Sequence, residues 1–124
     1  MRRVAIAIVI DAALIVLFAA LGRRTHDEGS AIGGTLVVAT PFLIGYAIAA
    51  SALRLDRAPF RVSRGAAVWA GGILVGLVLR GTAFDRGLAP AFVVVAIITT
   101  GALLLGWRLV LGRFTGAAAH APGG

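Results

Sequence analysis

The sequence predicts an all-α membrane protein, specifically an antiparallel four-helix transmembrane bundle. Of its 124 residues, 60% are hydrophobic, and the mean hydropathy is +0.99. A soluble domain of this size is normally closer to half apolar. Four apolar runs are each long enough, or nearly so, to cross a hydrocarbon layer about 30 Å thick. Short polar connections make consecutive helices antiparallel neighbours. The predicted spans are residues 4–21, 31–53, 65–80 and 88–106.

The four runs differ in their polar interruptions. The first is broken only by Asp11, which argues against a cleaved signal peptide and for a retained span. The second contains Pro41 near its centre. The third is short and needs Arg80 to reach the interface, whereas Pro90 falls in the first turn of the fourth, where its missing N–H is not needed. We therefore expect one membrane domain over residues 1–114. The small and polar residues 115–124 predict a disordered tail.

Arginine distribution predicts the orientation. All 12 basic residues are arginine, and eight of them lie in the N-terminus, the second connection and the C-terminal region, which share one side of the membrane. By the positive-inside rule both termini are cytoplasmic, and the protein is a multi-pass protein of the inner or plasma membrane. The same distribution explains the net charge of +7 without a nucleic acid partner.

Several chemistries are excluded or disfavoured by composition. The chain has no cysteine, so disulfides, thiolate metal sites and cysteine nucleophiles are excluded. It also lacks a glycine-rich nucleotide loop, a zinc-protease helix motif and histidines paired at haem-ligand spacing. We therefore expect a protein that is not an enzyme and needs no cofactor.

Small residues four apart mark helix faces for close packing. Gly72, Gly76 and Arg80 share a face of the third span, and Gly45 and Ala49 share one of the second. Such faces form grooves for a neighbouring helix in lipid. They predict packing within the bundle or, less simply, a homodimer. Trp69 and Trp107 fit an aromatic belt at the membrane interface.

A polar site is predicted near the membrane midplane. An ionisable side chain at this depth marks a functional site or a buried partner. Pro41 cannot donate a hydrogen bond to the carbonyl of Val37, which then needs another donor. The group could hold a proton, a cation or a water, or Asp11 could simply hydrogen-bond a neighbour and join the helices. The candidate residues are Asp11, Thr40, Tyr46, Thr99 and Thr100.

A second candidate site lies at the outer face. The first connection brings two guanidinium groups, an imidazole and two carboxylates into a few residues, which suits an anion or a lipid headgroup. Adjacent ligands rarely converge on one ion, so no metal site is predicted. A solvated loop is the simplest alternative, and Arg80 is expected to reach lipid headgroups or an outer acid. The candidates are Arg23, Arg24, His26, Asp27, Glu28 and Arg80.

The chain resembles a family of small four-span prokaryotic membrane proteins of unknown function. The resemblance rests on Asp11, the loop from Gly22 to Glu28, Pro41-Phe42-Leu43 with Gly45, Gly76 to Arg80, and Gly106-Trp107-Arg108. It covers nearly the whole chain up to Arg108. It implies the four-span topology and no activity.

Three functions remain open on the sequence. The first is a non-enzymatic membrane protein that assembles with itself or with a larger complex. The second is a minimal transporter or channel for protons, cations or small solutes, working as an oligomer with Asp11 as its site. The third is a protein that binds lipid headgroups through residues 23–28.

Overall fold

A computed structural model describes residues 2–24, 31–82 and 90–119, and the side chains of 22–24, 31–33 and 114–119 are not described. These ranges form four α-helices and one short 3₁₀ helix, with no strand. All four α-helices are long and apolar enough to span a membrane. The all-α, four-span fold class is therefore confirmed. The elements are α1 (Arg2–Arg24), α2 (Ala31–Ala52), η1 (Leu55–Arg57), α3 (Val62–Gly81) and α4 (Pro90–Ala119).

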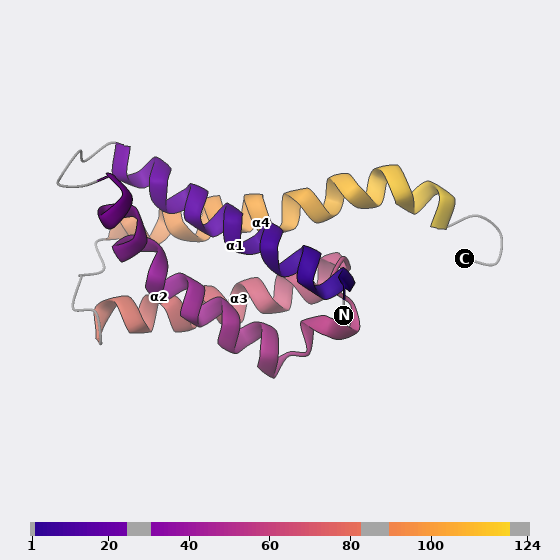
Figure 1. The fold of residues 1–124 in the computed structure, drawn as a ribbon, viewed down its shortest axis with the longest axis horizontal. Helices are drawn as coiled ribbons and strands as arrows, with labels where there is room; N and C mark the ends of the chain where they lie inside the picture. Colours follow the sequence, from indigo (N-terminus) through magenta and orange to yellow (C-terminus); the bar gives the residue numbers. More distant parts are fainter. Residues whose placement is uncertain (1, 25–30, 83–89, 120–124) are drawn as a thin grey trace.

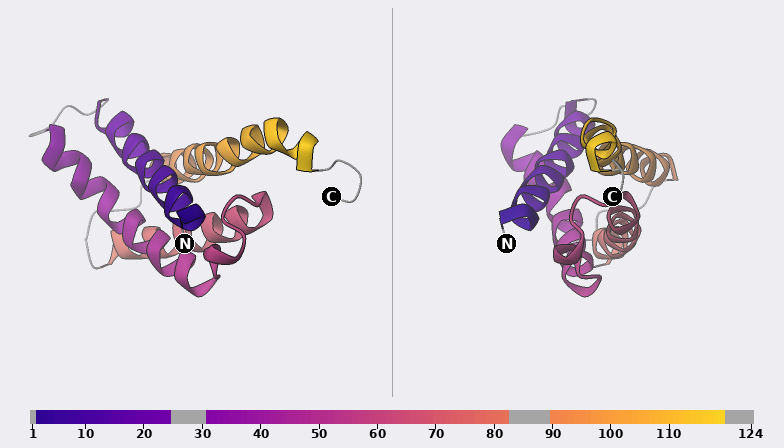
Figure 2. Two further views of the ribbon diagram at one scale, coloured as in Figure 1. Left: turned by 45° about the vertical axis from the view of Figure 1, so that its right-hand side comes forward. Right: turned by 90° about the vertical axis from the view of Figure 1, so that its right-hand side faces the viewer.

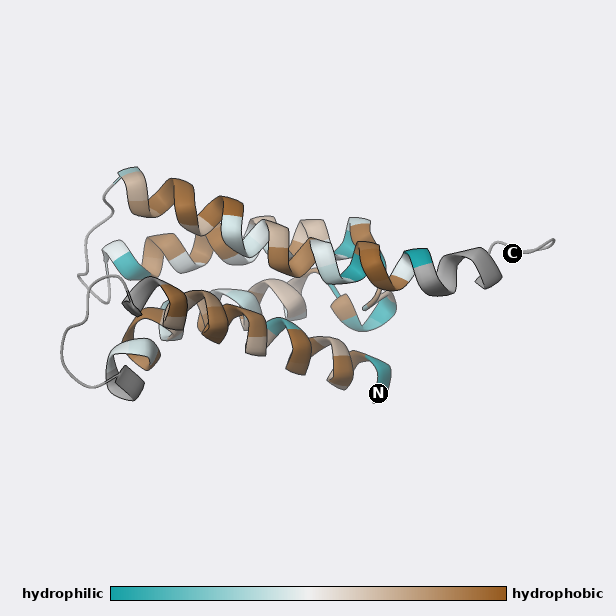
Figure 3. Cartoon of the chain, turned by 90° about the horizontal axis from the view of Figure 1, so that it is seen from above, coloured by the Kyte–Doolittle hydropathy of each residue, from teal (hydrophilic) through white to brown (hydrophobic). Residues whose placement is uncertain are grey.

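The helices alternate in direction along the bundle. The start of α1, the connection that contains η1 and the distal part of α4 lie at one end (Figure 1). We call it the arginine-rich end, since residues 2, 3, 54, 57, 61, 64, 108 and 113 are its arginines. Figure 2 shows α4 continuing beyond the other helices towards the C-terminus. Hydrophobic residues cover much of all four helices in Figure 3, as expected for surfaces that face lipid.

The second and third helices pack through glycine. A Cβ on Gly45 would stand 2.5 Å from the Gly72 carbonyl oxygen and 2.7 Å from the Gly76 nitrogen. Contacts this short mean that the two backbones touch, as small-residue faces allow. The faces predicted from the glycine spacing therefore pack against each other within one chain, and they are not available for a homodimer.

The connection between α2 and α3 folds back against the bundle. Arg54, two residues after the end of α2, adopts a left-handed conformation with φ 55°, at the position where helices most often place glycine. Leu55 and Pro59 are then buried at the arginine-rich end. This connection therefore closes the bundle at that end.

The fourth helix is longer than predicted. It runs from Pro90 to Ala119, and its apolar span reaches Arg113 where the sequence suggested an end at residue 106. Residues 115–119 of the predicted disordered tail are helical, and 120–124 lie outside the described residues. The longer helix places Arg108 inside the span, with important consequences for the site.

Aromatic rings fill the opposite half of the bundle. Phe18, Phe42 and Phe92 meet with ring centroids 5.8–6.2 Å apart. The Arg80 guanidinium carbon lies 3.9 Å from the centroid of the Phe92 ring. Arg80 thus stacks on an aromatic side chain of α4, a contact that neither of its expected arrangements included.

Candidate functional site

Asp11 is fully buried and accepts four hydrogen bonds. One carboxylate oxygen, Oδ1, accepts from Trp107 Nε1 and from Arg108 Nη1, each at 2.8 Å. The other, Oδ2, accepts from the Tyr46 hydroxyl and from Arg108 Nη2, the latter at 2.7 Å. An ionised carboxylate offers about four lone-pair sites. All of them are therefore used within the protein.

Arg108 is the cation that balances Asp11. Its side chain is 1% exposed, and its two terminal nitrogens bind the two carboxylate oxygens side by side. This bidentate geometry is the strongest arrangement of an arginine and a carboxylate. Arg108 also donates to two backbone carbonyls, Pro59 through Nε at 3.0 Å and Leu104 through Nη1 at 2.9 Å. Nearly all its donor capacity is consequently satisfied.

The site joins all four α-helices of the bundle. Asp11 belongs to α1, Tyr46 to α2, and Trp107 and Arg108 to α4, while Pro59 lies in the connection before α3. The third helix contributes Gly65, since a Cβ there would stand 2.6 Å from Arg108 Cδ and 2.7 Å from its Nε. Only a residue without a side chain leaves room for the guanidinium. We call Asp11, Tyr46, Trp107 and Arg108, with the Pro59 carbonyl, the clasp.

The clasp is connected to the surface by two further contacts. Trp107 meets Phe60 edge to face with centroids 5.8 Å apart. The Arg3 guanidinium carbon lies 5.3 Å from the centroid of the Phe60 ring. These contacts connect Trp107 of the clasp to the exposed residue Arg3 at the arginine-rich end.

The predicted midplane group is only partly assembled. Tyr46 does meet Asp11, as expected from their similar depths. Thr40 instead donates to the Leu36 carbonyl of its own helix, and Thr100 donates to the Ala96 carbonyl of its own helix. Thr99 is half-buried and is not a partner of Asp11. Asp11 lies at the centre of the candidate span Arg2–Leu21, whereas Arg108 lies five residues before the end of its own span at Arg113, about 8 Å along the helix.

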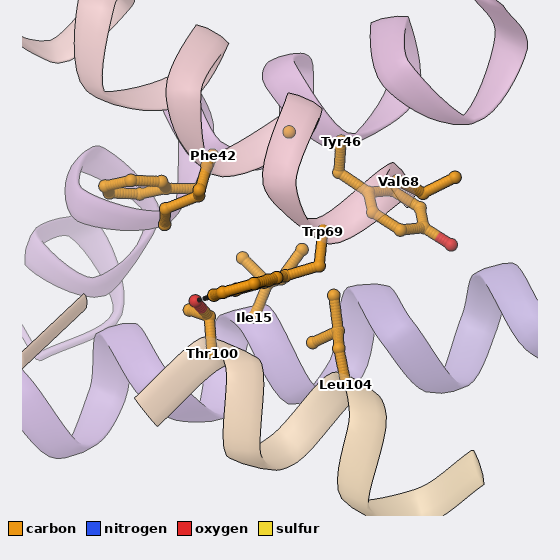
Figure 4. A pocket seen from close by; sticks show the side chains of 9 residues that line it. Ile15, Phe42, Tyr46, Val68, Trp69, Thr100 and Leu104 are labelled. Carbon is orange, nitrogen blue, oxygen red and sulfur yellow. Dashed lines mark hydrogen bonds between the residues drawn. The ribbon is translucent and has the colours of Figure 1, made fainter. Parts of the chain in front are cut away.

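A small cavity lies between the four helices, beside the clasp. Its volume is about 20 Å³, close to the minimum that holds one water molecule. Trp69 lies across it and donates to the Thr100 hydroxyl at 3.0 Å, whereas the Tyr46 hydroxyl points away from that bond (Figure 4). The lining is otherwise mainly apolar: Ile15, Phe42, Val68, Gly72, Ile73 and Leu104.

Both tryptophans have roles other than the predicted interfacial belt. The Trp69 ring packs on Gly101, where an added Cβ would stand 2.9 Å from the ring. Trp107 donates to the buried carboxylate. Each indole thus joins two helices inside the bundle.

The structure leaves most of the predicted outer site undescribed. His26, Asp27 and Glu28 lie outside the described residues, and the side chains of Arg23 and Arg24 are likewise not described. Arg80 is described, and its contact with Phe92 is within the helical bundle.

Arg108, Trp107, Pro59 and Gly65 were not predicted as site residues. The sequence predicts that Arg108 lies just beyond the fourth span, because Trp107-Arg108 interrupts the apolar run after Gly106. The three residues after it, Leu109-Val110-Leu111, are apolar and continue the run. An arginine between apolar segments, in a chain with one buried acid, was the signal available in the sequence.

The comparison with protein families agrees with this architecture. The model of a family described as "Protein of unknown function (DUF3054)" matches residues 8–111. The chain belongs to the DUF3054 family. The matched stretch contains every residue of the clasp. No curated protein and no solved structure matches the chain.

The geometry of the clasp suits a structural contact between helices better than the exchange of a proton or a cation. A transported cation or proton needs an oxygen of Asp11, and both oxygens are already occupied twice. Opening the site would leave a charge buried without its partner, which costs several kcal/mol. The clasp therefore holds α1, α2 and α4 to the connection that precedes α3.

Proposed function

We propose that this DUF3054 protein is a non-enzymatic, multi-pass protein of the cell membrane that acts as a subunit of a membrane assembly. Both of its termini are cytoplasmic. The observation that carries the proposal is the saturation of Asp11, the one acidic residue within the apolar runs, by partners of the same chain.

The small free volume between the described helices favours a function at the outer surface. The cavity between the helices is about 20 Å³, too small for a solute larger than water. Substrate passage through the bundle would require the clasp to open. A subunit, in contrast, needs only a stable body that presents its surface to another protein.

The available surface differs from the one that the glycine pattern suggested. The glycine faces of α2 and α3 are occupied by each other. Large apolar side chains remain exposed on other faces, with Val9 on α1, Leu74 on α3 and Ile98 on α4. These faces meet lipid or the helices of a partner.

Native mass spectrometry of protein extracted gently from its own membrane tests the proposal. We expect a defined complex that contains another membrane protein, with the same stoichiometry in independent extractions. A homo-oligomer alone, together with solute flux in proteoliposomes that Asp11→Asn abolishes without unfolding the protein, would instead show a transporter. Asp11→Asn is compared with Thr99→Val, which alters a polar side chain of α4 outside the clasp.

A further inference from the structure

The arginine-rich end carries more positive charge than its acids can balance. Within the part of the chain that the structure describes, Asp56 is its one acid outside the clasp, and Arg54 already binds that carboxylate through two hydrogen bonds of 3.0 Å. Arg64 donates to the Leu53 carbonyl. Five further arginines are exposed and have no carboxylate within ion-pair distance among the residues that the structure describes: Arg2, Arg3, Arg57, Arg61 and Arg113.

These five arginines lie at the boundary of the membrane spans. Arg2 and Arg113 are the first and last residues of two candidate spans, and Arg61 immediately precedes a third. Arg57 lies in η1, which connects the second span to the third. Their charges therefore come from three separate chain segments, and the ends of the candidate spans bring them to the level of the lipid headgroups.

Contacts within the fold hold some of these arginine side chains in position before any ligand binds. Arg3 is held over the Phe60 ring, and Phe60 packs on Trp107 of the clasp. Pro59 and Leu55 are buried on either side of Arg57. A guanidinium that is already positioned loses less conformational entropy when it binds a ligand.

We propose that this arginine rim, defined as Arg2, Arg3, Arg57, Arg61 and Arg113, binds the phosphodiester headgroups of anionic phospholipids. The planar guanidinium matches phosphate oxygens in a bidentate manner, and its location at the interface brings it to the depth of the phosphates. The proposal is independent of the subunit role, because it requires only that the four helices span the membrane.

The rim differs from the outer loop that the sequence suggested for headgroups. It lies at the opposite end of α1, and its charges are described in the structure. Binding by the rim places the clasp directly behind bound lipid, because Arg3, Phe60 and Trp107 connect the two.

The test compares two double variants of the full chain in lipid nanodiscs. Arg57→Gln/Arg61→Gln removes two charges from the rim, while Arg23→Gln/Arg24→Gln removes two from the other end of α1. Retention of phosphatidylglycerol is measured by native mass spectrometry against phosphatidylcholine, at about 0.15 M and 0.5 M salt. Inorganic phosphate is added as a competitor to separate a lipid site from a site for free anions.

We expect the rim variant to bind phosphatidylglycerol about 25-fold more weakly, since each arginine near an anionic surface contributes about fivefold. The control variant should bind as the unmodified protein does, and higher salt should weaken binding. Both rim side chains are exposed, so the thermal unfolding of the variant should be unchanged. Equal retention by the rim variant, loss in the control instead, or displacement by inorganic phosphate would each overturn the proposal.

Discussion

Asp11 and Arg108 each carry a charge in a place where neither contacts lipid or water, so each depends on the other. Asp11 is fully buried and Arg108 is 1% exposed. Removing one partner of such a pair leaves the other unbalanced, which typically costs about 3–5 kcal/mol. Replacing both with neutral groups costs much less.

Asp11→Asn should therefore destabilise the protein by about 3–5 kcal/mol, because the Arg108 charge loses its counter-charge. The free energy of unfolding is measured by denaturant titration in detergent micelles. The double variant Asp11→Asn/Arg108→Gln should lose less than the sum of the two single variants, which a double-mutant cycle quantifies. Strictly additive losses would contradict the ion pair.

Gly65→Ala should weaken the clasp without removing any of its polar groups. The new methyl group would stand 2.6 Å from Arg108 Cδ and 2.7 Å from Nε, so the guanidinium must move away from Asp11 or Pro59. Overpacking of this kind costs about 1–3 kcal/mol. Gly106→Ala is the matched control, since nothing lies within 4 Å of a Cβ at Gly106. Equal midpoints of thermal unfolding for the two variants would refute this interpretation.

The sequence could single out Asp11, yet it could not supply its complete set of partners. A lone acid in an apolar run is conspicuous, and the similar depth of Tyr46 gave a correct partner. Arg108 is 97 residues away, so its pairing depends on the tilt and rotation of two helices. Thr40 and Thr100 are not partners of Asp11, because a threonine hydroxyl in a helix can donate to the carbonyl four residues earlier.

At the level of elements, the contact between α2 and α3 depends on the absence of side chains. Helix association in lipid relies on van der Waals contact between closely approaching backbones. A larger residue at the crossing cannot be accommodated by a side-chain rotation when it meets backbone atoms. The helices must then separate along their length.

Gly45→Ala should accordingly destabilise the bundle by about 1–3 kcal/mol. Its methyl group would meet the Gly72 carbonyl oxygen at 2.5 Å and the Gly76 nitrogen at 2.7 Å, both backbone atoms. Gly112→Ala, with nothing within 4 Å of the added Cβ, should leave the unfolding midpoint unchanged. The difference between the two midpoints is the measurement, and no difference would mean that α2 and α3 are further apart.

The connection after α2 contains an exposed ion pair, Arg54–Asp56, and the titration of its acid can be followed on its own. Hydrogen bonds from Arg54, and then its charge, lower the pKa of Asp56 below the ordinary value of about 3.9. Any stability from the pair is thus fully present above that value and is lost as the pH falls through the lowered pKa. Both side chains are exposed, so we expect little effect near pH 7.

Arg54→Gln should raise the pKa of Asp56 towards its ordinary value, because the charged hydrogen-bond donor is removed. Carboxyl NMR titration in micelles gives this pKa directly. Arg57→Gln is the control, since its charge is a minor cause of the shift. An unchanged Asp56 titration in Arg54→Gln would show that the pair does not form.

Element bounds followed from the sequence where a polar residue ends an apolar run. The second helix ends at Ala52, one residue from its expected end. The fourth helix exceeds its predicted length, because an adjacent tryptophan and arginine, here Trp107-Arg108, are typical of a membrane boundary. A buried arginine does not end a helix when an acid of another helix neutralises it, and that information is absent from the local sequence.

For the molecule as a whole, composition was sufficient to predict the fold class. Hydropathy alone requires four helices that satisfy their own backbone hydrogen bonds, since lipid supplies no alternative partners. The packing of the helices against one another adds two features that hydropathy does not predict, the glycine contact between α2 and α3 and the clasp. The connection between α2 and α3, which the structure describes, lies at the arginine-rich end, so its exposed residues report on one side of the membrane (Figure 1).

Topology is the property of the whole molecule that can be tested most directly, because the chain has no cysteine of its own. Ser63 and Thr82 are exposed at opposite ends of α3. Since arginine accumulates on the cytoplasmic side, we expect the Ser63 end to be cytoplasmic. A membrane-impermeant maleimide applied to intact cells should label Thr82→Cys, whereas Ser63→Cys should react only after permeabilisation. The unmodified protein gives the background, and the reverse pattern would place both termini outside.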